Sequence, residues 1–180
     1  DASKNDKEVR SLHFEGNRTF SDDELSARVL TTPSSLTRRY IRHFGAKRCY
    51  PDVGLGPDVE ALTAFYKNNG FYATRVDTLV KPVAPNAVDV TFHIEEGEPL
   101  RIDTLNITGL DSVPKPGEIT NNLEMKTTQR FGLLLFYTDI DTIVSRLRNA
   151  GYPKADVYKA FRTHPAEHRV HFHAGVEVRL

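Results

Sequence analysis

The chain has 180 residues, and its 39 % hydrophobic and 27 % charged residues are ordinary proportions for globular domains, of which this length allows one or two. Lys and Arg together number 24, as do Asp and Glu, and this zero net charge argues against a dedicated binder of nucleic acid or another polyanion. Cys49 is the single cysteine, which excludes an internal disulfide, a cysteine zinc site and a CxxC redox motif.

No segment of the sequence looks like a membrane span or a targeting signal. The longest apolar run, GLLLFY at 132–137, is far shorter than the roughly 20 residues that a helix needs to span a bilayer. The chain does not begin with Met and shows no signal-peptide pattern. We therefore expect a processed protein or a piece excised from a longer one.

The first half of the chain opens with a strand and a capped helix. Residues 8–16 form a short extended run that a glycine closes. Ser21 and Glu24 have the spacing of a capping box, and Phe20 and Leu25 can form the hydrophobic staple around it. These signals predict a short helix over residues 22–30.

A second helix and two strands complete the first half. Pro57 suits the first turn of a helix, apolar side chains recur after it at helical spacing, and Gly70 suits the residue that ends the helix. Residues 71–80 are rich in strand formers, and residues 87–97 alternate apolar and polar side chains. Turn residues between the two runs predict a hairpin, which gives the order β-α-α-β-β.

The second half repeats the first. KNNGFYATRV at 67–76 and RNAGYPKADV at 148–157 share one pattern, and their glycines, Gly70 and Gly151, are 81 residues apart (151 − 70). Solenoid repeats have shorter periods of roughly 20–50 residues. The spacing therefore indicates two copies of one small domain.

The elements expected in the second half follow from this offset. Leu62 of the first copy aligns with Ile143 of the second, so the buried stripe of the second helix is retained. Thr138 is the predicted N-cap of that helix, with Asp139 and Asp141 at its positive end. Two prolines and a glycine interrupt the first helix of this copy, for which we expect a shorter or later-starting helix. The expected strands are 101–109, 152–161 and 168–180.

These patterns resemble the polypeptide-transport-associated (POTRA) domain. The matching segments are FEGNRTFSDDEL, YKNNGFYATRV, VDVTFHIEEGEP, IDTLNITG and RLRNAGYPKADV. The resemblance extends from Glu8 to Leu180. It implies an α+β fold of two tandem β-α-α-β-β domains, 8–97 and 98–180, each with a three-stranded mixed sheet covered on one face by two helices.

The resemblance also implies a place and a function. It implies a module on the periplasmic side of the outer membrane, within an assembly or secretion factor of the BamA or TamA type that carries its own C-terminal β-barrel. The expected partners are unfolded outer-membrane protein precursors and periplasmic accessory subunits or lipoproteins; no enzyme activity, cofactor or nucleic acid is expected. Extended clients could add to an outer strand by β-augmentation. A static docking scaffold that binds no client is the alternative.

The resemblance places the outer strand at 71–80 in the first copy and at 152–161 in the second. Pro153 cannot donate a backbone hydrogen bond, so we expect the first copy to have the longer usable edge. The predicted edge residues are Phe71, Tyr72, Thr74, Val76, Thr78, Val80, Val157, Tyr158 and Lys159.

A basic loop at 38–48 suggests a second contact surface. Nucleic acid is one interpretation of its cations and aromatics, although the zero net charge disfavours it. The first copy is longer than the second in this region, and loops that differ between copies often carry specific contacts. We therefore expect a protein partner at Arg38, Arg39, Tyr40 and Arg42.

Two further patterns have ordinary explanations. His168, His171 and His173 could suggest a metal-dependent enzyme, but no Cys or carboxylate cluster accompanies them, so we expect a solvated strand face. The apolar run at 131–137 is expected to lie beneath the helices of the second domain, with a partner-binding patch as the alternative. No Ser/His/Asp or Cys/His arrangement and no phosphate-binding loop is present, so catalysis is not expected.

Overall fold

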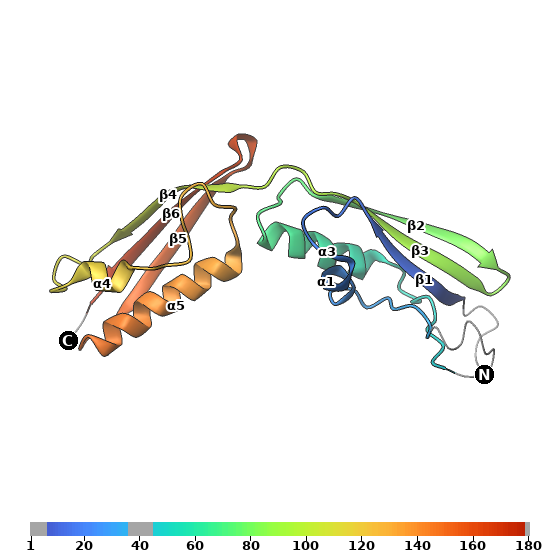
Figure 1. Ribbon diagram of the computed structural model, residues 1–180, viewed down its shortest axis with the longest axis horizontal. Helices are drawn as coiled ribbons and strands as arrows, with labels where there is room; N and C mark the ends of the chain where they lie inside the picture. Colours follow the sequence, from blue (N-terminus) through green and yellow to red (C-terminus); the bar gives the residue numbers. More distant parts are fainter. Residues whose placement is uncertain (1–6, 36–44, 179–180) are drawn as a thin grey trace. The chain divides into compact units, whose positions relative to one another are not determined.

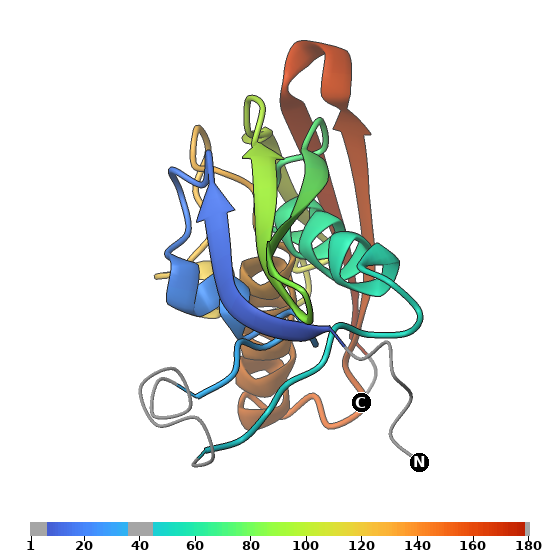
Figure 2. The same cartoon turned by 90° about the vertical axis from the view of Figure 1, so that its right-hand side faces the viewer.

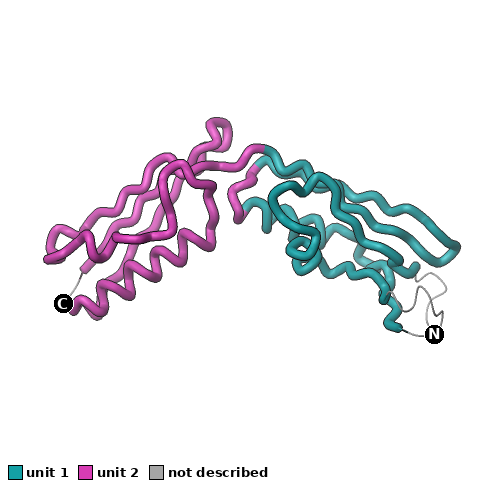
Figure 3. Tube along the Cα trace, in the orientation of Figure 1, with its two compact units in different colours: residues 1–67, 73–97 teal, residues 68–72, 98–180 magenta. Residues whose placement is uncertain are grey.

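The computed structural model describes residues 7–35 and 45–178, and the chain divides into two compact units. Unit 1 comprises Asp1–Lys67 and Ala73–Gly97, and unit 2 comprises Asn68–Tyr72 and Glu98–Leu180 (Figure 3). Within the described residues, each unit holds a three-stranded mixed sheet and two α-helices, which confirms the predicted α+β fold (Figure 1). No helix in these residues is long and apolar enough to cross a membrane.

Unit 1 is built around a central strand. Its elements in chain order are β1 (Glu8–Glu15), α1 (Asp22–Ser26), α3 (Gly56–Asn68), β2 (Arg75–Ala84) and β3 (Ala87–Glu95). β3 lies in the middle of the sheet, parallel to β1 and antiparallel to β2 (Figure 2). The side chains that alternate on one face of β3 form the core with Leu62 and Tyr66 of α3. They are Val88, Val90, Phe92 and Ile94.

Unit 2 repeats this arrangement around an aromatic core. Its elements are β4 (Arg101–Thr108), α4 (Pro116–Thr120), α5 (Leu133–Asn149), β5 (Asp156–His164), the 3-10 turn η1 (Pro165–Glu167) and β6 (Arg169–Glu177). β6 is the central strand. The ring centroid of Phe136 on α5 lies 4.9 Å from that of Phe172 on β6 and 5.7 Å from that of Phe161 on β5. These ring contacts hold the longer helix on the sheet.

The capping box predicted for α1 is confirmed, but the helix is shorter than expected. The N–H of Glu24 donates to Ser21 Oγ at 3.3 Å, and the N–H of Ser21 donates to Glu24 Oε2 at 2.9 Å. Further along, the N–H groups of Leu30 and Thr31 donate to the carboxylate of Asp58 at 2.6 and 3.1 Å. These donors are therefore bonded to α3 and do not continue the helix.

The longer helix of unit 2 begins earlier than predicted. Gly132 is its N-cap, so the prediction that Thr138 caps it is wrong. Thr138 lies inside α5, where its hydroxyl donates to the carbonyl of Leu134 at 2.9 Å. The run at 131–137 thus leads into the helix and forms its first turns. Phe136 is buried there, whereas Leu134 is 79 % exposed.

Asp139 is a buried anchor and does not lie at the positive end of the helix. Its carboxylate accepts the N–H groups of Glu124 and Met125 at 2.8 and 2.7 Å. Asp58 occupies the equivalent place 81 residues earlier (139 − 58), and the two side chains are 1 % and 2 % exposed. Each aspartate fastens the chain that follows the short helix of its unit to the longer helix. Sequence reasoning missed this pair, which the 81-residue offset could have revealed.

Both outer strands begin later than the sequence predicts. β2 starts at Arg75 and β5 at Asp156, because the residues after Gly70 and Gly151 form turns before the chain becomes extended. β2 correspondingly continues to residue 84 and includes Pro82, which the sequence assigned to the hairpin turn.

Candidate functional site

Of the two edges of the first sheet, the one formed by β2 is open over the greater length. It pairs with β3 on one side, and among the described residues no backbone hydrogen bond joins its other side to another segment. The opposite edge is partly covered by the chain between α1 and α3. There the N–H of Val9 in β1 donates to the carbonyl of Arg48, and its carbonyl accepts the N–H of Ser34, both at 2.9 Å.

These bonds of Val9 also show which backbone groups of β2 face outward. Val9 has a buried side chain, and its backbone groups point away from β3. Side-chain face and backbone direction alternate together along a strand. Because β2 runs antiparallel to β1, its core-facing residues also direct their N–H and C=O groups away from β3. Pro82 agrees with this assignment, since it is core-facing opposite Val88 and its missing N–H costs no bond to β3.

Three of the predicted residues carry this outward edge. Val76, Thr78 and Val80 lie opposite buried residues of β3 and therefore face the core side. Their backbone N–H groups point to the open side, at every second residue. The intervening residues, such as Leu79 at 51 % exposure, lie on the other sheet face and use their backbone groups to bind β3.

Phe71, Tyr72 and Thr74 do not belong to the strand, so the prediction that they line its edge is wrong. Phe71 is buried at 3 % exposure, and Tyr72 packs against the core of unit 2, where burial raises the pKa of its hydroxyl. Thr74 donates its hydroxyl to the carbonyl of Glu96 at 2.9 Å. These residues precede β2, and its open edge is formed by the residues from Arg75 onward.

Unit 2 has an equivalent outer strand in β5. The expectation that Pro153 shortens this edge is wrong, because β5 begins after Pro153 and contains no proline. Val157 is buried, Tyr158 donates its hydroxyl to Glu177 at 2.8 Å, and the ammonium of Lys159 lies 4.5 Å from the ring centroid of Tyr137. Tyr158 and Lys159, two of the three residues predicted at this edge, therefore already contact other side chains.

Glu96 organises the end of the first sheet and was missed by sequence reasoning. Its carboxylate accepts the N–H groups of Arg18 and Thr19, both at 2.9 Å, and the hydroxyl of Thr19 at 2.7 Å. The Tyr66 hydroxyl donates to the same carboxylate at 3.1 Å. Burial, together with this negative charge, raises the pKa of Tyr66 well above its ordinary value. The cluster joins the loop after β1 and the helix α3 to the end of β3.

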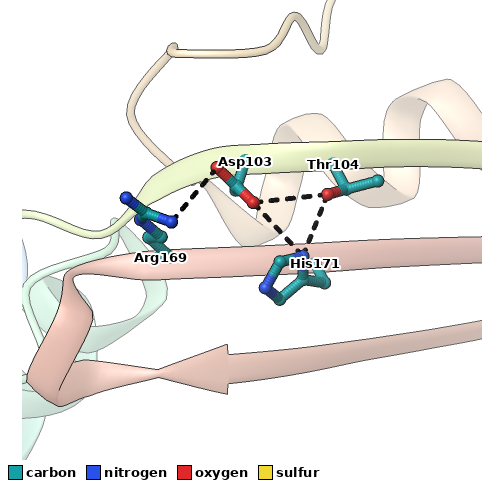
Figure 4. A network of polar contacts seen from close by, with 4 residues as sticks. All are labelled: Asp103, Thr104, Arg169 and His171. Atoms are coloured by element: carbon teal, nitrogen blue, oxygen red, sulfur yellow. Dashed lines mark hydrogen bonds and ion pairs between the residues drawn. The ribbon is translucent and has the colours of Figure 1, made fainter.

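The histidines of β6 form a surface network. His171 Nδ1 lies 2.9 Å from Thr104 Oγ1 and 3.5 Å from Asp103 Oδ2, and Arg169 is 3.9 Å from the same Asp103 (Figure 4). His168 occupies the left-handed turn before β6. In the part of the chain that the structure describes, no group of three or more His, Cys, Asp or Glu residues could hold a metal ion. The network joins β4 to β6.

The predicted partner loop lies largely outside the described residues. Arg38, Arg39, Tyr40 and Arg42 all fall in the gap at 36–44, so their role stays a prediction.

Proteins of similar sequence are assembly factors of the outer membrane. The chain is 26 % identical over 154 residues to "Outer membrane protein assembly factor BamA" of Neisseria meningitidis, covering 83 % of the chain and 18 % of that protein. It is 21 % identical over 157 residues to the protein of the same name from Neorickettsia risticii, covering 87 % of the chain and 20 % of the relative. The chain thus spans about a fifth of the length of these curated relatives.

Solved structures share the fold. A crystal structure of Haemophilus influenzae BamA POTRA3-5 superposes with a TM-score of 0.51 at 20 % identity, over 97 % of this chain and 67 % of that one. BamA from Haemophilus ducreyi lacking POTRA domains 1-3 gives 0.50 at 14 % identity, over 96 % of this chain and 29 % of that one. The family model described as POTRA, surface antigen variable number repeat, matches residues 7–97, and the chain therefore belongs to the POTRA family.

Proposed function

We propose that this chain is the periplasmic part of an outer-membrane protein assembly or secretion factor, and that β2 holds extended client segments by β-augmentation. Membership of the POTRA family and the similarity to proteins named outer membrane protein assembly factor BamA support the setting. The open edge of β2 is the observation that supports the mechanism. The proposed activity is binding, without catalysis or a cofactor.

The edge suits clients of many sequences. The outward N–H and C=O groups of Val76, Thr78 and Val80 offer a ladder to any extended backbone, whatever its side chains. A client strand would pair with these residues and extend the sheet from three strands to four. Because main-chain pairing is tolerant of sequence, such an edge fits a receptor for unfolded barrel precursors, whose membrane strands are themselves extended.

Side chains beside the edge give the client limited apolar contact. Val76 and Val80 are half-buried on the core side of β2, and Leu79 is exposed on the opposite face. A client with alternating side chains would therefore meet apolar surface on both faces. Few such contacts make each binding event weak, and retention would come from several weak contacts made by one long client.

A pair of adjacent proline substitutions tests this mechanism. Thr78→Pro removes an outward donor, and its effect on folding should be small because Pro82 already occupies an outward position of the same strand. Leu79→Pro removes a donor to β3 and should destabilise unit 1. The measurement is an NMR titration of the chain with a peptide that has the sequence of an outer-membrane barrel strand, with circular dichroism as the check on folding.

The two variants separate client binding from scaffolding. We expect Thr78→Pro to remain folded and to lose peptide binding, while Leu79→Pro loses structure. Unchanged peptide affinity in a folded Thr78→Pro variant would show that the client does not bind at this edge. That result would favour a static docking scaffold. Accessory periplasmic subunits or lipoproteins would then be the partners, with the parent's β-barrel supplying the attachment to the outer membrane.

A further inference from the structure

The sheet of unit 2 has an outer face on the side away from its helices (Figure 1). Residues of β6 that alternate with its buried core residues lie on this face, and their pairing partners on β5 lie beside them. Four neighbouring positions at one end of the face carry basic side chains. They are Arg162 and His164 on β5, and Arg169 and His171 on β6. We call these four residues the basic quartet.

The basic quartet is a square of cross-strand neighbours. Arg162 pairs with His171, and His164 pairs with Arg169. The ring centroids of His164 and His171 lie 4.9 Å apart across the diagonal. His171 is half-buried, and the other three side chains are exposed. The four cationic groups can therefore reach a single ligand that approaches the face from solvent.

The quartet has little negative charge of its own. In the part of the chain that the structure describes, Asp103 is the carboxylate that pairs with it, 3.9 Å from Arg169 and 3.5 Å from His171 Nδ1 (Figure 4). Arg162 forms no ion pair with the described residues. Like charges on neighbouring strands destabilise a sheet. A bound anion would relieve this repulsion.

We propose that the basic quartet binds an acidic segment of a partner protein, whose carboxylates pair with Arg162 and Arg169. The planar guanidinium group of arginine suits this ligand, because it can hold a carboxylate through two parallel hydrogen bonds. Side chains on the face of the sheet make these contacts, so binding needs no backbone pairing and leaves the strand edges free. The site is independent of client binding at β2.

The opposite end of the same face favours a short acidic segment over an anionic membrane surface. Asp156 pairs there with Glu177 and lies six residues before Arg162 on β5 (162 − 156). At about 3.3 Å per residue, the two ends are about 20 Å apart. Exposed charges are screened beyond about 8 Å at physiological ionic strength, so the ends act separately. A flat anionic surface would meet both ends, whereas a short segment can lie over the basic end alone.

Acidification should strengthen this site. Histidine side chains in general gain charge as the pH falls toward about 6. A carboxylate bound beside His164 and His171 favours their charged forms, so binding takes up protons and the affinity rises as the pH falls. Asp103 also favours these charged forms, whereas the neighbouring cations oppose them. The charged and titratable groups around the two rings are Arg101 and Asp103 on β4, Arg162 on β5, and Arg169 and His173 on β6.

Unit 1 supplies a matched control face. Asp89 of β3 and His171 of β6 hold equivalent positions, because each pairs with the residue that follows the register irregularity of the first strand in its unit. Lys81 pairs with Asp89 as Arg162 pairs with His171, and both cations are exposed. In unit 1 a carboxylate thus lies opposite the cation. We therefore expect no acidic segment to bind there.

The test is an NMR titration of the isotope-labelled chain with a synthetic peptide of consecutive glutamates, at about pH 6 and about pH 7.5. A peptide of consecutive glutamines is the control, since it has a similar backbone without the charges. The glutamate peptide should shift the signals of the basic quartet and should have the lower Kd at the lower pH. The glutamine peptide should leave these signals unchanged.

Three variants of the chain test which side chains bind. Arg162→Gln should raise the Kd for the glutamate peptide about tenfold, the loss expected for one charge-assisted hydrogen bond. Lys81→Gln should leave the Kd unchanged. Asp103→Asn should lower the Kd, because it removes the carboxylate that competes with the peptide for Arg169. If Arg162→Gln does not fold, Arg169→Gln makes the same test.

The remaining outcomes separate this site from the proposed function and from a membrane. Thr78→Pro should leave the response of the basic quartet intact. Equal shifts with the two peptides, or an unchanged Kd in a folded Arg162→Gln variant, would overturn the acidic-segment site and leave the proposed function standing. Vesicles that contain phosphatidylglycerol are added in a separate titration. A response of the quartet to these vesicles but not to the glutamate peptide would also overturn the proposal, in favour of a membrane surface.

Discussion

Replacing Asp139 tests how the second unit is held together. Its carboxylate accepts two backbone N–H groups at 2.7 and 2.8 Å and is almost completely buried. A hydrogen bond to a charged group contributes about 1.5–3 kcal/mol, and a buried donor left without a partner adds a desolvation cost. Removal of the buried charge offsets part of this loss. We therefore expect Asp139→Ala to lower the free energy of unfolding of unit 2 by about 3 kcal/mol.

The assay compares three variants of the whole chain. Hydrogen exchange of the buried β6 amides during urea unfolding reports on unit 2 alone. Asp139→Asn keeps one acceptor oxygen and should lose about half as much stability as the alanine variant. Asp141→Ala, on the exposed side of the same helix, should change stability by less than about 0.5 kcal/mol. Equal stability of Asp139→Ala and Asp141→Ala would refute the anchoring function assigned to Asp139.

Three further predictions address the cores, the strand ends and the helix cap. Leu62→Ala and Ile143→Ala should each lower the free energy of unfolding, measured with denaturant, by about 2–5 kcal/mol. A loss below about 0.5 kcal/mol would show that the apolar face of α3 or α5 does not face a core. Gly109→Ala should lower the thermal unfolding midpoint, because φ at this residue is +86° and a Cβ would meet the carbonyl of Val176. Gly117→Ala should raise the midpoint, because Gly117 is helical and a Cβ there would meet no neighbouring atom. A hydrogen bond from the Ser21 backbone lowers the pKa of Glu24 below its ordinary value of 4.5. The free energy of unfolding should therefore be higher for the natural chain than for Glu24→Gln above pH 4.5, and this advantage should be lost as the pH falls through the pKa of Glu24 in the folded chain. An advantage that grows on acidification would contradict this sign.

Local signals predicted the fold because each acts over a few residues. The capping box at Ser21 and the alternation predicted for residues 87–97 are short-range patterns, and the structure contains the corresponding elements, α1 and β3. The first helix of unit 2, α4, has five residues, the same number as α1, so its prolines do not make it the shorter of the two. Strand order came from the family resemblance, since no local pattern specifies which strand is central.

The errors arose where tertiary contacts override local preference. α5 begins with LLLFY because Phe136 is buried in the aromatic core, although Thr138 has the better capping chemistry. Phe71 and Tyr72 look like strand residues, but Phe71 is buried and Tyr72 packs against the core of unit 2. Asp58 and Asp139 were missed as anchors because their partners are backbone groups 14 to 28 residues away in the chain, and only the 81-residue offset relates the two.

Amide hydrogen exchange along β2, with and without a bound barrel-strand peptide, tests the central claim most directly. Asp77 and Leu79 bind β3 through their N–H groups and should be protected in both states. Val76, Thr78 and Val80 should exchange quickly in the free chain and become protected when the peptide binds, giving an alternating response along the strand. Bound peptide with these three amides still exchanging at their free rates would contradict β-augmentation at this edge.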